Sequence, residues 1–72
     1  MEATKKIGEN IRHIRNQRGL SQMALALETG SAQRYIGEIE RGLKSPTIRM
    51  LNKIAKALDV SLEEIVKGCE RV

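Results

Sequence analysis

Apolar residues recur along this chain at intervals of three and four, in five stretches separated by turn-forming residues. This spacing is the period of an amphipathic helix and predicts five helices. They are expected over about residues 4–17, 22–29 and 32–41, after the Ser45-Pro46-Thr47 segment, and from Ser61 through about Lys67. The apolar faces predict an all-α core built from Ile7, Ile11, Ile14, Leu25, Ala26, Ile36, Ile39, Leu51, Ile54, Ala55, Leu58, Leu62, Ile65 and Val66.

Residues that start and stop helices lie at the ends of these stretches. The first helix is expected to stop at Gly19 and the third at Gly42, because glycine often follows the last helical residue. Ser21 can cap the second helix through its hydroxyl. Ser61 with Glu64 three residues later predicts a capping box at the start of the fifth helix.

The two central helices have the spacing of a helix-turn-helix. Ala26 is small at the position where the helices would approach most closely, and Gly30 can take the positive φ that the turn requires. Ile36 and Ile39 then form one inward apolar stripe, and Gln22 opens the unit. A unit of this kind commonly presents its second helix to the DNA major groove.

Composition adds bounds to this picture. The chain has 72 residues, enough for one domain with a small core that buries only about 60% of its unfolded surface. Phe and Trp are absent and Tyr35 is the single aromatic residue, so Ile, Leu, Ala and Val must fill the core. This choice suits helices that meet at close range and argues against an all-β sandwich.

One cysteine and the absence of a long apolar run favour a cytoplasmic location. Cys69 is the only cysteine in the chain, so an internal disulfide is not expected. No signal-like or membrane-spanning run is apparent in the sequence. Cys69 is either an inert thiol near the C-terminus or a redox sensor that pairs across a dimer.

The net charge of +4 is distributed unevenly along the sequence. Residues 1–18 carry +3 and residues 41–57 carry +5, whereas residues 19–40 and 58–72 each carry −2. Two basic segments beside a helix-turn-helix could contact phosphates on both sides of a groove, with the acidic C-terminal end facing away. The alternative is an ordinary solvated surface.

A series of short motifs resembles one known family. The motifs are Leu20-Ser21-Gln22, Ala26, Gly30, Tyr35-Ile36, Ile39-Glu40-Arg41-Gly42, Ser45-Pro46-Thr47, Leu51, Ile54-Ala55-Lys56-Ala57-Leu58 and Val60-Ser61-Leu62-Glu63-Glu64-Ile65. In this order they are similar to the Cro and phage-repressor regulators, also called XRE-like. The resemblance implies a single compact, five-helix, lambda-repressor-like domain over residues 1–72, with its core at about 7–66. Its second and third helices would form a helix-turn-helix at about 21–41.

Rotation by 100° per residue predicts which side chains of the third helix face outward. The expected inward set is Ala32, Ile36 and Ile39, and the expected outward set is Arg34, Gly37, Glu38 and Arg41. Gln33 lies nearer the flank, but it can reach base edges from the helix tip. The resemblance assigns base reading to Gln33, Arg34 and Glu38.

The chemistry of these three side chains suits base edges. Arg34 offers two parallel donors for guanine O6 and N7, Gln33 can pair with adenine, and Glu38 can accept from cytosine N4. Glu38 could instead hold Arg34 through an ion pair worth a few tenths of a kcal/mol. Gly37 costs roughly 1 kcal/mol relative to alanine in a helix. It is either a means of closer approach to the duplex or a tolerated defect.

Contacts to the DNA backbone are expected from other positions. Gln22 resembles the family glutamine that touches a phosphate, and Lys44 follows the third helix where the family contacts the second strand. Ser31 and Tyr35 offer hydroxyls at the groove edge, and Arg12 is a further candidate. For Tyr35, a ring packed over the second helix is compatible with the same contact.

Arg15 and Glu40 match the arginine and glutamate that form an internal salt bridge in this family. The resemblance therefore implies an ion pair that joins the first helix to the third. Loss of one member of a buried pair of this kind costs about 3–5 kcal/mol. An exposed pair worth less than about 1 kcal/mol is the alternative.

The expected partner is double-stranded DNA with a two-fold symmetric operator. One recognition helix reads few base pairs, so a homodimer is expected, weak in solution and assisted by DNA. The family resemblance points to the fifth helix and residues 66–72 as its interface. The expected function is therefore a sequence-specific transcriptional regulator, either a repressor or an autoregulator.

A protein-binding adaptor, such as an antitoxin or a bridging coactivator, is the alternative function. Met23 and Leu27 lie one turn apart on the outward side of the second helix, where the family usually has charged residues. They are either a contact for a protein partner or scattered surface residues. An enzyme is not expected, because His13 is the sole histidine and no metal-ligand spacing or cofactor motif occurs.

Overall fold

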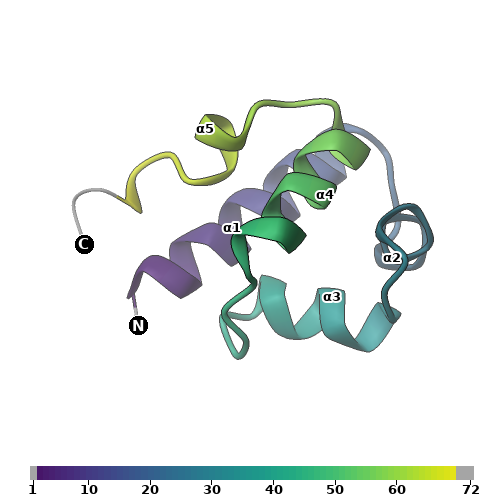
Figure 1. Ribbon diagram of the computed structural model, residues 1–72, viewed down its shortest axis with the longest axis horizontal. Helices are drawn as coiled ribbons and strands as arrows, with labels where there is room; N and C mark the ends of the chain where they lie inside the picture. Colours follow the sequence, from purple (N-terminus) through teal and green to yellow (C-terminus); the bar gives the residue numbers. More distant parts are fainter. Residues whose placement is uncertain (1, 70–72) are drawn as a thin grey trace.

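The computed structural model describes residues 2–69, which form five helices and no strand (Figure 1). The helices are α1 (Glu2–Gln17), α2 (Gln22–Thr29), α3 (Gln33–Glu40), α4 (Ile48–Leu58) and α5 (Leu62–Ile65). The all-α prediction is confirmed, and each predicted helix is present. The first helix begins two residues earlier than expected.

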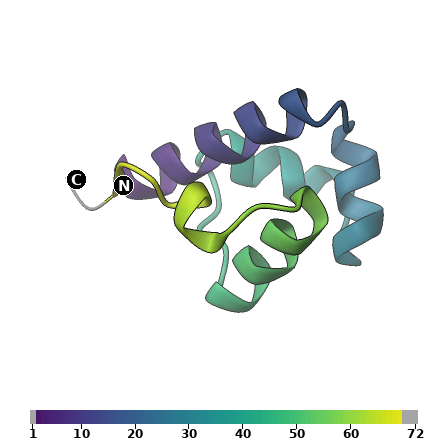
Figure 2. The ribbon, with the colours of Figure 1, turned by 90° about the horizontal axis from the view of Figure 1, so that it is seen from above.

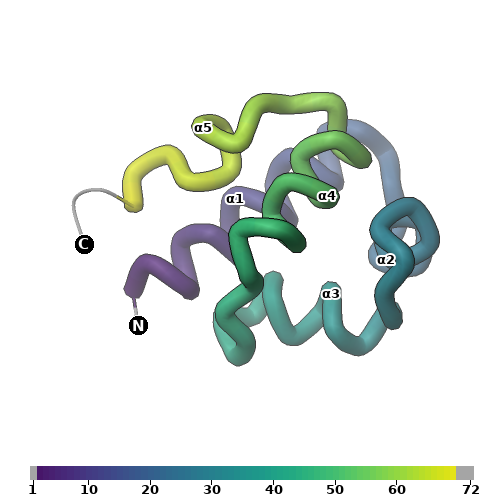
Figure 3. Tube along the Cα trace, viewed as in Figure 1, coloured from purple at the N-terminus to yellow at the C-terminus, as the bar shows by residue number. Residues whose placement is uncertain are grey.

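The helices are arranged so that α3 lies along one side of the molecule. It packs against both α1 and α2, while α4 packs on α2 and on α5. The tube in Figure 3 shows α3 and α5 on opposite sides, with α1 and α4 between them. Seen from above in Figure 2, α1 runs along the length of the molecule. The Cys69 thiol lies 3.8 Å from the Ala3 carbonyl oxygen, so the C-terminal turn meets the start of α1.

The core is aliphatic, as the sequence predicts. Side chains exposed by less than 2% come from every helix: Ile11, Leu25, Ile36, Ile39, Ile54, Leu58 and Ile65. Ile14, Ala26, Leu51 and Ala55 are also buried, and Met50 joins them without having been predicted. Three predicted core residues, Ile7, Leu62 and Val66, are only partly buried against this cluster. Leu62 is the first residue of α5 and Val66 follows its last residue, whereas Ile7 lies in the N-terminal half of α1.

The close approach of α1 to α3 depends on Gly8, which is buried in α1. A Cβ atom at this position would lie 2.8 Å from the Glu40 carbonyl oxygen and would overlap the Ile39 carbonyl oxygen. The backbones therefore meet at a distance that only glycine permits. The pattern of apolar residues does not predict this contact.

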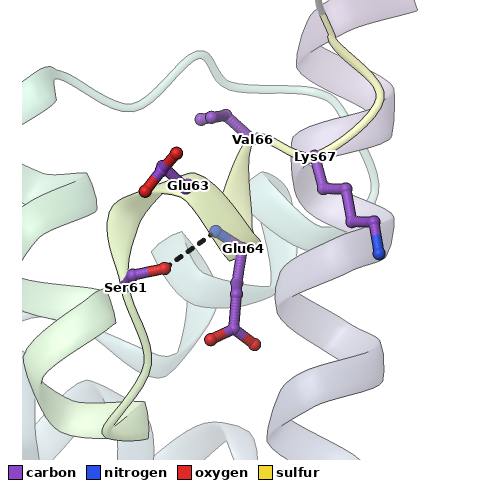
Figure 4. Close-up of a pocket in the computed structure, with 5 residues that line it drawn as sticks. All are labelled: Ser61, Glu63, Glu64, Val66 and Lys67. Carbon is purple, nitrogen blue, oxygen red and sulfur yellow. Dashed lines mark hydrogen bonds between the residues drawn. The ribbon is translucent and has the colours of Figure 1, made fainter.

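The fifth helix is shorter than predicted. The Ser61 hydroxyl accepts a hydrogen bond from the Glu64 backbone N–H at 3.3 Å, which is one half of the expected capping box (Figure 4). The helix ends at Ile65 rather than at Lys67. The Asn10 amide of α1 donates hydrogen bonds to the carbonyl oxygens of Ile65 and Lys67, at 2.8 and 2.9 Å. These carbonyls are thus satisfied without another helical turn.

The predicted inward face of α3 was wrong at two positions. Ala32 is exposed, because it precedes the helix with an extended backbone at φ −89° and ψ 147°. Gly37, predicted to face outward, is buried against α2. The buried side chains and backbone of α3 therefore centre on Ile36, Gly37, Ile39 and Glu40.

Candidate nucleic-acid interface

The turn between α2 and α3 is held by local hydrogen bonds. The Ser21 hydroxyl caps α2 by accepting from the Ala24 N–H at 3.0 Å. Gly30 ends this helix in the left-handed region, with φ at 69° and ψ at 30°. The Ser31 N–H then donates to the Ala26 carbonyl oxygen at 2.9 Å. Glycine is favoured at this φ because a Cβ atom would be strained.

A buried polar network joins three helices behind this turn. Arg15 of α1 meets Glu40 of α3 through Nε to Oε2 at 2.6 Å and Nη2 to Oε1 at 3.1 Å. Its Nη1 also donates to the Leu20 carbonyl oxygen at 2.8 Å. Gln22, the first residue of α2, donates from Nε2 to Glu40 Oε1 at 3.0 Å. The two buried charges are therefore paired, and the network fixes the C-terminal end of α3.

The N-terminal end of α3 is exposed to solvent. Gln33 and Arg34 lie exposed on its first turn, and the Arg34 side chain is 88% accessible. Its Nε is 3.7 Å from Glu38 Oε2, beyond hydrogen-bond distance, and the Glu38 side chain is only 20% accessible. Glu38 therefore holds Arg34 only weakly.

An open notch of about 350 Å³ separates the start of α2 from the exposed side of α3. It is lined by Gln22, Gln33, Arg34, Gly37 and Arg41. A Cβ atom added at Gly37 would lie 3.6 Å from Gln22 Oε1, so the glycine forms part of the floor under this amide. The notch brings together Gln22, which was predicted to contact the DNA backbone, with Gln33 and Arg34, which were predicted to read bases.

The structure also places Gly37 and Arg41 in the notch, although neither was among the predicted contact residues. Helical rotation pointed to Arg41 as an outward residue, and that signal could have identified it. The sequence contained no signal for the packing of Gly37 against Gln22, because this contact depends on the crossing of two helices.

The remaining predicted contact residues lie apart from the notch. Ser31 is half-buried, with its hydroxyl 2.8 Å from Thr29 Oγ1. Tyr35 is half-buried and packs against the core. Lys44 is exposed in the loop after α3, and Arg12 is exposed on α1.

A larger hollow of about 540 Å³ lies beside α5, far from this surface (Figure 4). It is lined by Ser61, Glu63, Glu64, Val66 and Lys67. Two of these five side chains are acidic, and α5 lies across the molecule from α3 (Figure 1). The described part of the acidic C-terminal segment thus faces away from α3, whereas residues 70–72 of the predicted dimer interface lie outside the described residues.

Among residues 2–69, no helix is long and apolar enough to cross a membrane. No group of three or more His, Cys, Asp or Glu side chains in the same range could hold a metal ion.

Comparison with known proteins identifies relatives over most of the chain. An HTH-type transcriptional regulator of Sinorhizobium fredii, y4dJ, is 36% identical over 66 residues, which cover 92% of this chain and 86% of the relative. The HTH-type transcriptional regulator SinR of Bacillus subtilis is 38% identical over 61 residues, but the chain covers only 55% of SinR. The structure of SinR in complex with SinI matches with a TM-score of 0.80, at 36% identity, over 86% of this chain and 61% of that one.

A solved protein–DNA complex matches the fold as well. The P22 c2 repressor, bound to a synthetic operator, aligns with a TM-score of 0.81 and 32% identity, over 90% of this chain and 98% of the repressor. The model of the helix-turn-helix family HTH_3 matches residues 11–65. The chain therefore belongs to the HTH_3 helix-turn-helix family, which confirms the resemblance to the Cro and phage-repressor regulators.

Proposed function

We propose that this protein controls transcription by inserting α3 into the major groove of a two-fold symmetric operator, as a repressor or autoregulator. The protein is a DNA-binding transcriptional regulator, as its family and its relatives indicate. Catalysis is not part of the proposal, because the matched relatives are regulators. Binding to DNA in this role implies a cytoplasmic location.

The exposed first turn of α3 is the observation that carries the proposal. Among residues 2–69, the Gln33 side chain has no hydrogen-bond partner, and Arg34 has only the 3.7 Å approach of Glu38. Polar side chains without partners at a helix tip are free to bond base edges. The Arg15–Glu40 pair holds the other end of the same helix, so the tip is presented on a fixed support.

The base-reading roles follow from side-chain chemistry. Arg34 pairs with guanine O6 and N7, and Gln33 pairs with adenine N6 and N7. Glu38 accepts from cytosine N4. Its Oε2 lies 3.7 Å from Arg34 Nε, so an ion pair with Arg34 would account for this carboxylate only weakly.

Backbone contacts fix the orientation of the domain. Lys44 and Arg12 are exposed cations that can bond phosphates on either side of the groove. The Gln22 amide donates one hydrogen to Glu40, and its Nε2 has a second hydrogen for a phosphate oxygen. The Ser31 and Tyr35 hydroxyls lie near the turn and serve as weaker contacts.

Two copies are required for adequate specificity, because one helix spans only a few base pairs. Two-fold related half-sites lie about 34 Å apart in known operators of this class. We expect a weak solution dimer that assembles fully on DNA, in which α5 and the segment after it form the contact.

Selection of duplexes from a randomised pool, followed by fluorescence-anisotropy binding across a salt series, tests the proposal. The wild type is expected to enrich a two-fold symmetric site and to bind it with strong salt dependence. The Arg34→Ala variant is expected to lose about 1–3 kcal/mol of discrimination at one base pair. Lys53→Ala removes a similar charge from α4 and serves as the control.

A failure to enrich any site at moderate salt would contradict this proposal and favour a protein partner. Met23 and Leu27 of α2 are 55% and 78% exposed, which is the observation that supports this second candidate. SinR, a relative, has been solved in complex with the protein SinI. These two side chains would then be the first to replace.

A further inference from the structure

We propose that Asn10 positions the contact between two copies of this chain, by holding the turn that carries Val66. Residues 65–67, at the end of α5, are named the Val66 turn. This inference rests on the proposed function, in which α5 and the segment after it form the dimer contact. It adds the residue on α1 that gives this surface its shape.

Both hydrogens of the Asn10 amide are donated to the Val66 turn. Nδ2 lies 2.8 Å from the Ile65 carbonyl oxygen and 2.9 Å from that of Lys67. A side-chain amide has two N–H donors, so this group is fully used. The two carbonyls flank Val66 in the sequence, and the backbone is therefore fixed on both sides of this residue.

The interior of α1 is an unfavourable place for an asparagine. Asparagine forms helix less readily than alanine, because its side chain competes for nearby backbone groups. Asn10 lies inside the helix Glu2–Gln17, and its amide instead bonds carbonyls 55 and 57 residues later in the chain. Asn10, Val66 and Lys67 all lie outside residues 11–65, the range that the family model matches. The contact therefore ties together the two segments that flank this range.

The Val66 turn has little support of its own. α5 has four residues, and a helix of this length is not stable by itself. Ile65 is fully buried and anchors the start of the turn, whereas Val66 is half-buried and Lys67 is exposed. Beyond Ile65, contacts with α1 hold the chain, and the two Asn10 hydrogen bonds are among them.

The apolar side chains at this turn can be covered by a second copy. The Val66 N–H donates to the Leu62 carbonyl oxygen at 3.2 Å, so Leu62 and Val66 lie one helical turn apart on the same face. Both are only partly buried against the core. Figure 4 shows the Val66 side chain extending away from α1, whereas Lys67 lines a hollow with α1 residues on the other side. Two-fold symmetry would bring the same two apolar side chains of each copy together.

The charges around Val66 favour a second copy over DNA as the partner. The hollow of about 540 Å³ beside α5 is lined by Glu63 and Glu64 as well as by Val66 and Lys67. Two carboxylates repel a phosphate backbone. Under a two-fold axis, in contrast, the Lys67 of each copy can approach the carboxylates of the other. The rim of this surface is thus complementary to itself.

A turn that is fixed before association lowers the cost of forming the dimer. Side chains and backbone that become ordered only on binding lose conformational entropy, and this loss weakens the complex. In Asn10→Ala the Ile65 and Lys67 carbonyls would bond water instead, and the turn would no longer be held on α1. The dimer is therefore expected to weaken even where each copy stays folded.

Sedimentation equilibrium without DNA, over concentrations up to the millimolar range, measures this effect. Asn10→Ala is expected to raise the dimer dissociation constant by about fivefold or more. Asn16→Ala is the matched control, because it removes an exposed asparagine from the same helix with the same gain in helix propensity. Circular dichroism sets a temperature at which every variant is folded. Equal dissociation constants for the two variants would overturn the inference.

Val66→Ala tests whether Asn10 acts through Val66. This variant is expected to weaken the dimer by a similar factor, because it removes apolar contact from both copies. Adding Asn10→Ala to Val66→Ala should then change the dissociation constant by less than about twofold, as expected for coupled sites. Full additivity of the two substitutions would contradict the positioning role.

Fluorescence anisotropy with a whole operator and with a single half-site provides the test on DNA. Asn10→Ala should bind the whole operator more weakly than the wild type does, but bind the half-site equally well, because α3 is unchanged. A purely structural role would weaken binding to both duplexes by the same factor. That result would overturn the inference.

The outcomes separate this inference from the proposed function. A wild type that binds a two-fold operator, with an Asn10→Ala variant that dimerises as Asn16→Ala does, overturns only the role of Asn10. A wild type that enriches no duplex, with a dimer that Asn10→Ala weakens, contradicts the role in DNA binding and supports the dimer surface. A wild type that stays monomeric and enriches no duplex contradicts both.

Discussion

The two ends of α3 differ in the burial and the hydrogen bonding of their polar side chains. At the C-terminal end, Glu40 is 6% exposed and bonds to Arg15 and Gln22. At the N-terminal end, the Arg34 side chain is 88% accessible and its nearest carboxylate is 3.7 Å away. One end is fixed by the interior of the protein, whereas the other is available to a partner.

This difference shows how a small domain can hold α3, the proposed reading helix, in a defined orientation. Arg15 links Glu40 to the Leu20 carbonyl oxygen, so α1, the following turn and α3 are held together. Precise placement of donors matters because base edges differ only in the positions of a few polar atoms. Substitutions at the fixed end should therefore change stability first, and substitutions at the free end should change sequence preference alone.

The largest effect is expected from Arg15→Ala. It leaves the Glu40 carboxylate buried without its partner, which costs about 3–5 kcal/mol of unfolding free energy. Urea unfolding of the free protein measures this loss. Arg12→Ala removes an exposed arginine from the same helix and is the matched control, for which little change is expected. Equal stability of the two variants would show that the pair contributes nothing measurable.

A smaller loss is expected from Gly8→Ala. The added methyl group would overlap the Ile39 carbonyl oxygen and lie 2.8 Å from that of Glu40, so α1 and α3 must move apart. Overpacking of this kind costs about 1–3 kcal/mol, partly offset by the better helix propensity of alanine. Gly37→Ala is the matched control, because the same methyl group meets only the Gln22 amide at ordinary distance. A rise in melting temperature for Gly8→Ala would contradict the close packing.

The smallest effect on stability is expected from Glu38→Gln. Its pair with Arg34 is long and one partner is highly exposed, so the change in unfolding free energy should stay below about 0.5 kcal/mol. Repeated duplex selection should instead show a weakened preference at one base pair, where Glu38 accepts from cytosine. If the selected site is unchanged, Glu38 does not read a base.

The periodicity of apolar residues was sufficient to predict the helices and most of the buried core residues. The positions of Ile11, Leu25, Ile36 and Ile54 follow from the spacing of apolar residues, and all four are buried. Such side chains report the inward face directly, since their burial stabilises the fold. The turn at Gly30 was equally predictable because its positive φ favours glycine.

Contacts that depend on how the helices cross were not predictable in this way. Gly8 and Gly37 have no side chain, so a hydrophobic pattern says nothing of what packs against them. Rotation about a centre that included Ala32 placed Gly37 outward, whereas the crossing of α2 over α3 buries it. The end of α5 depends likewise on Asn10, which bonds carbonyls 55 and 57 residues later in the chain.

In the candidate site, too, some features could be predicted from the sequence and others depend on the folded arrangement. Family resemblance pointed to Arg15 with Glu40, and the structure has this ion pair at 2.6 Å. The roles of Gln33, Arg34 and Glu38 remain predictions that depend on DNA. Gln22 was assigned a phosphate contact, and the structure adds its hydrogen bond to Glu40. That bond could not be inferred from Gln22 alone, because it requires the final placement of three helices.

The most direct test of the division between the two ends is the ratio of affinities for the selected duplex and a scrambled duplex, measured with Arg34→Ala. The variant should melt at the wild-type temperature, because Arg34 makes no buried contact. Its affinity ratio should fall by about fivefold or more, which corresponds to the loss of about 1–3 kcal/mol from one guanine contact. A folded Arg34→Ala protein that keeps the wild-type ratio would contradict the proposal that this end of α3 reads the DNA sequence.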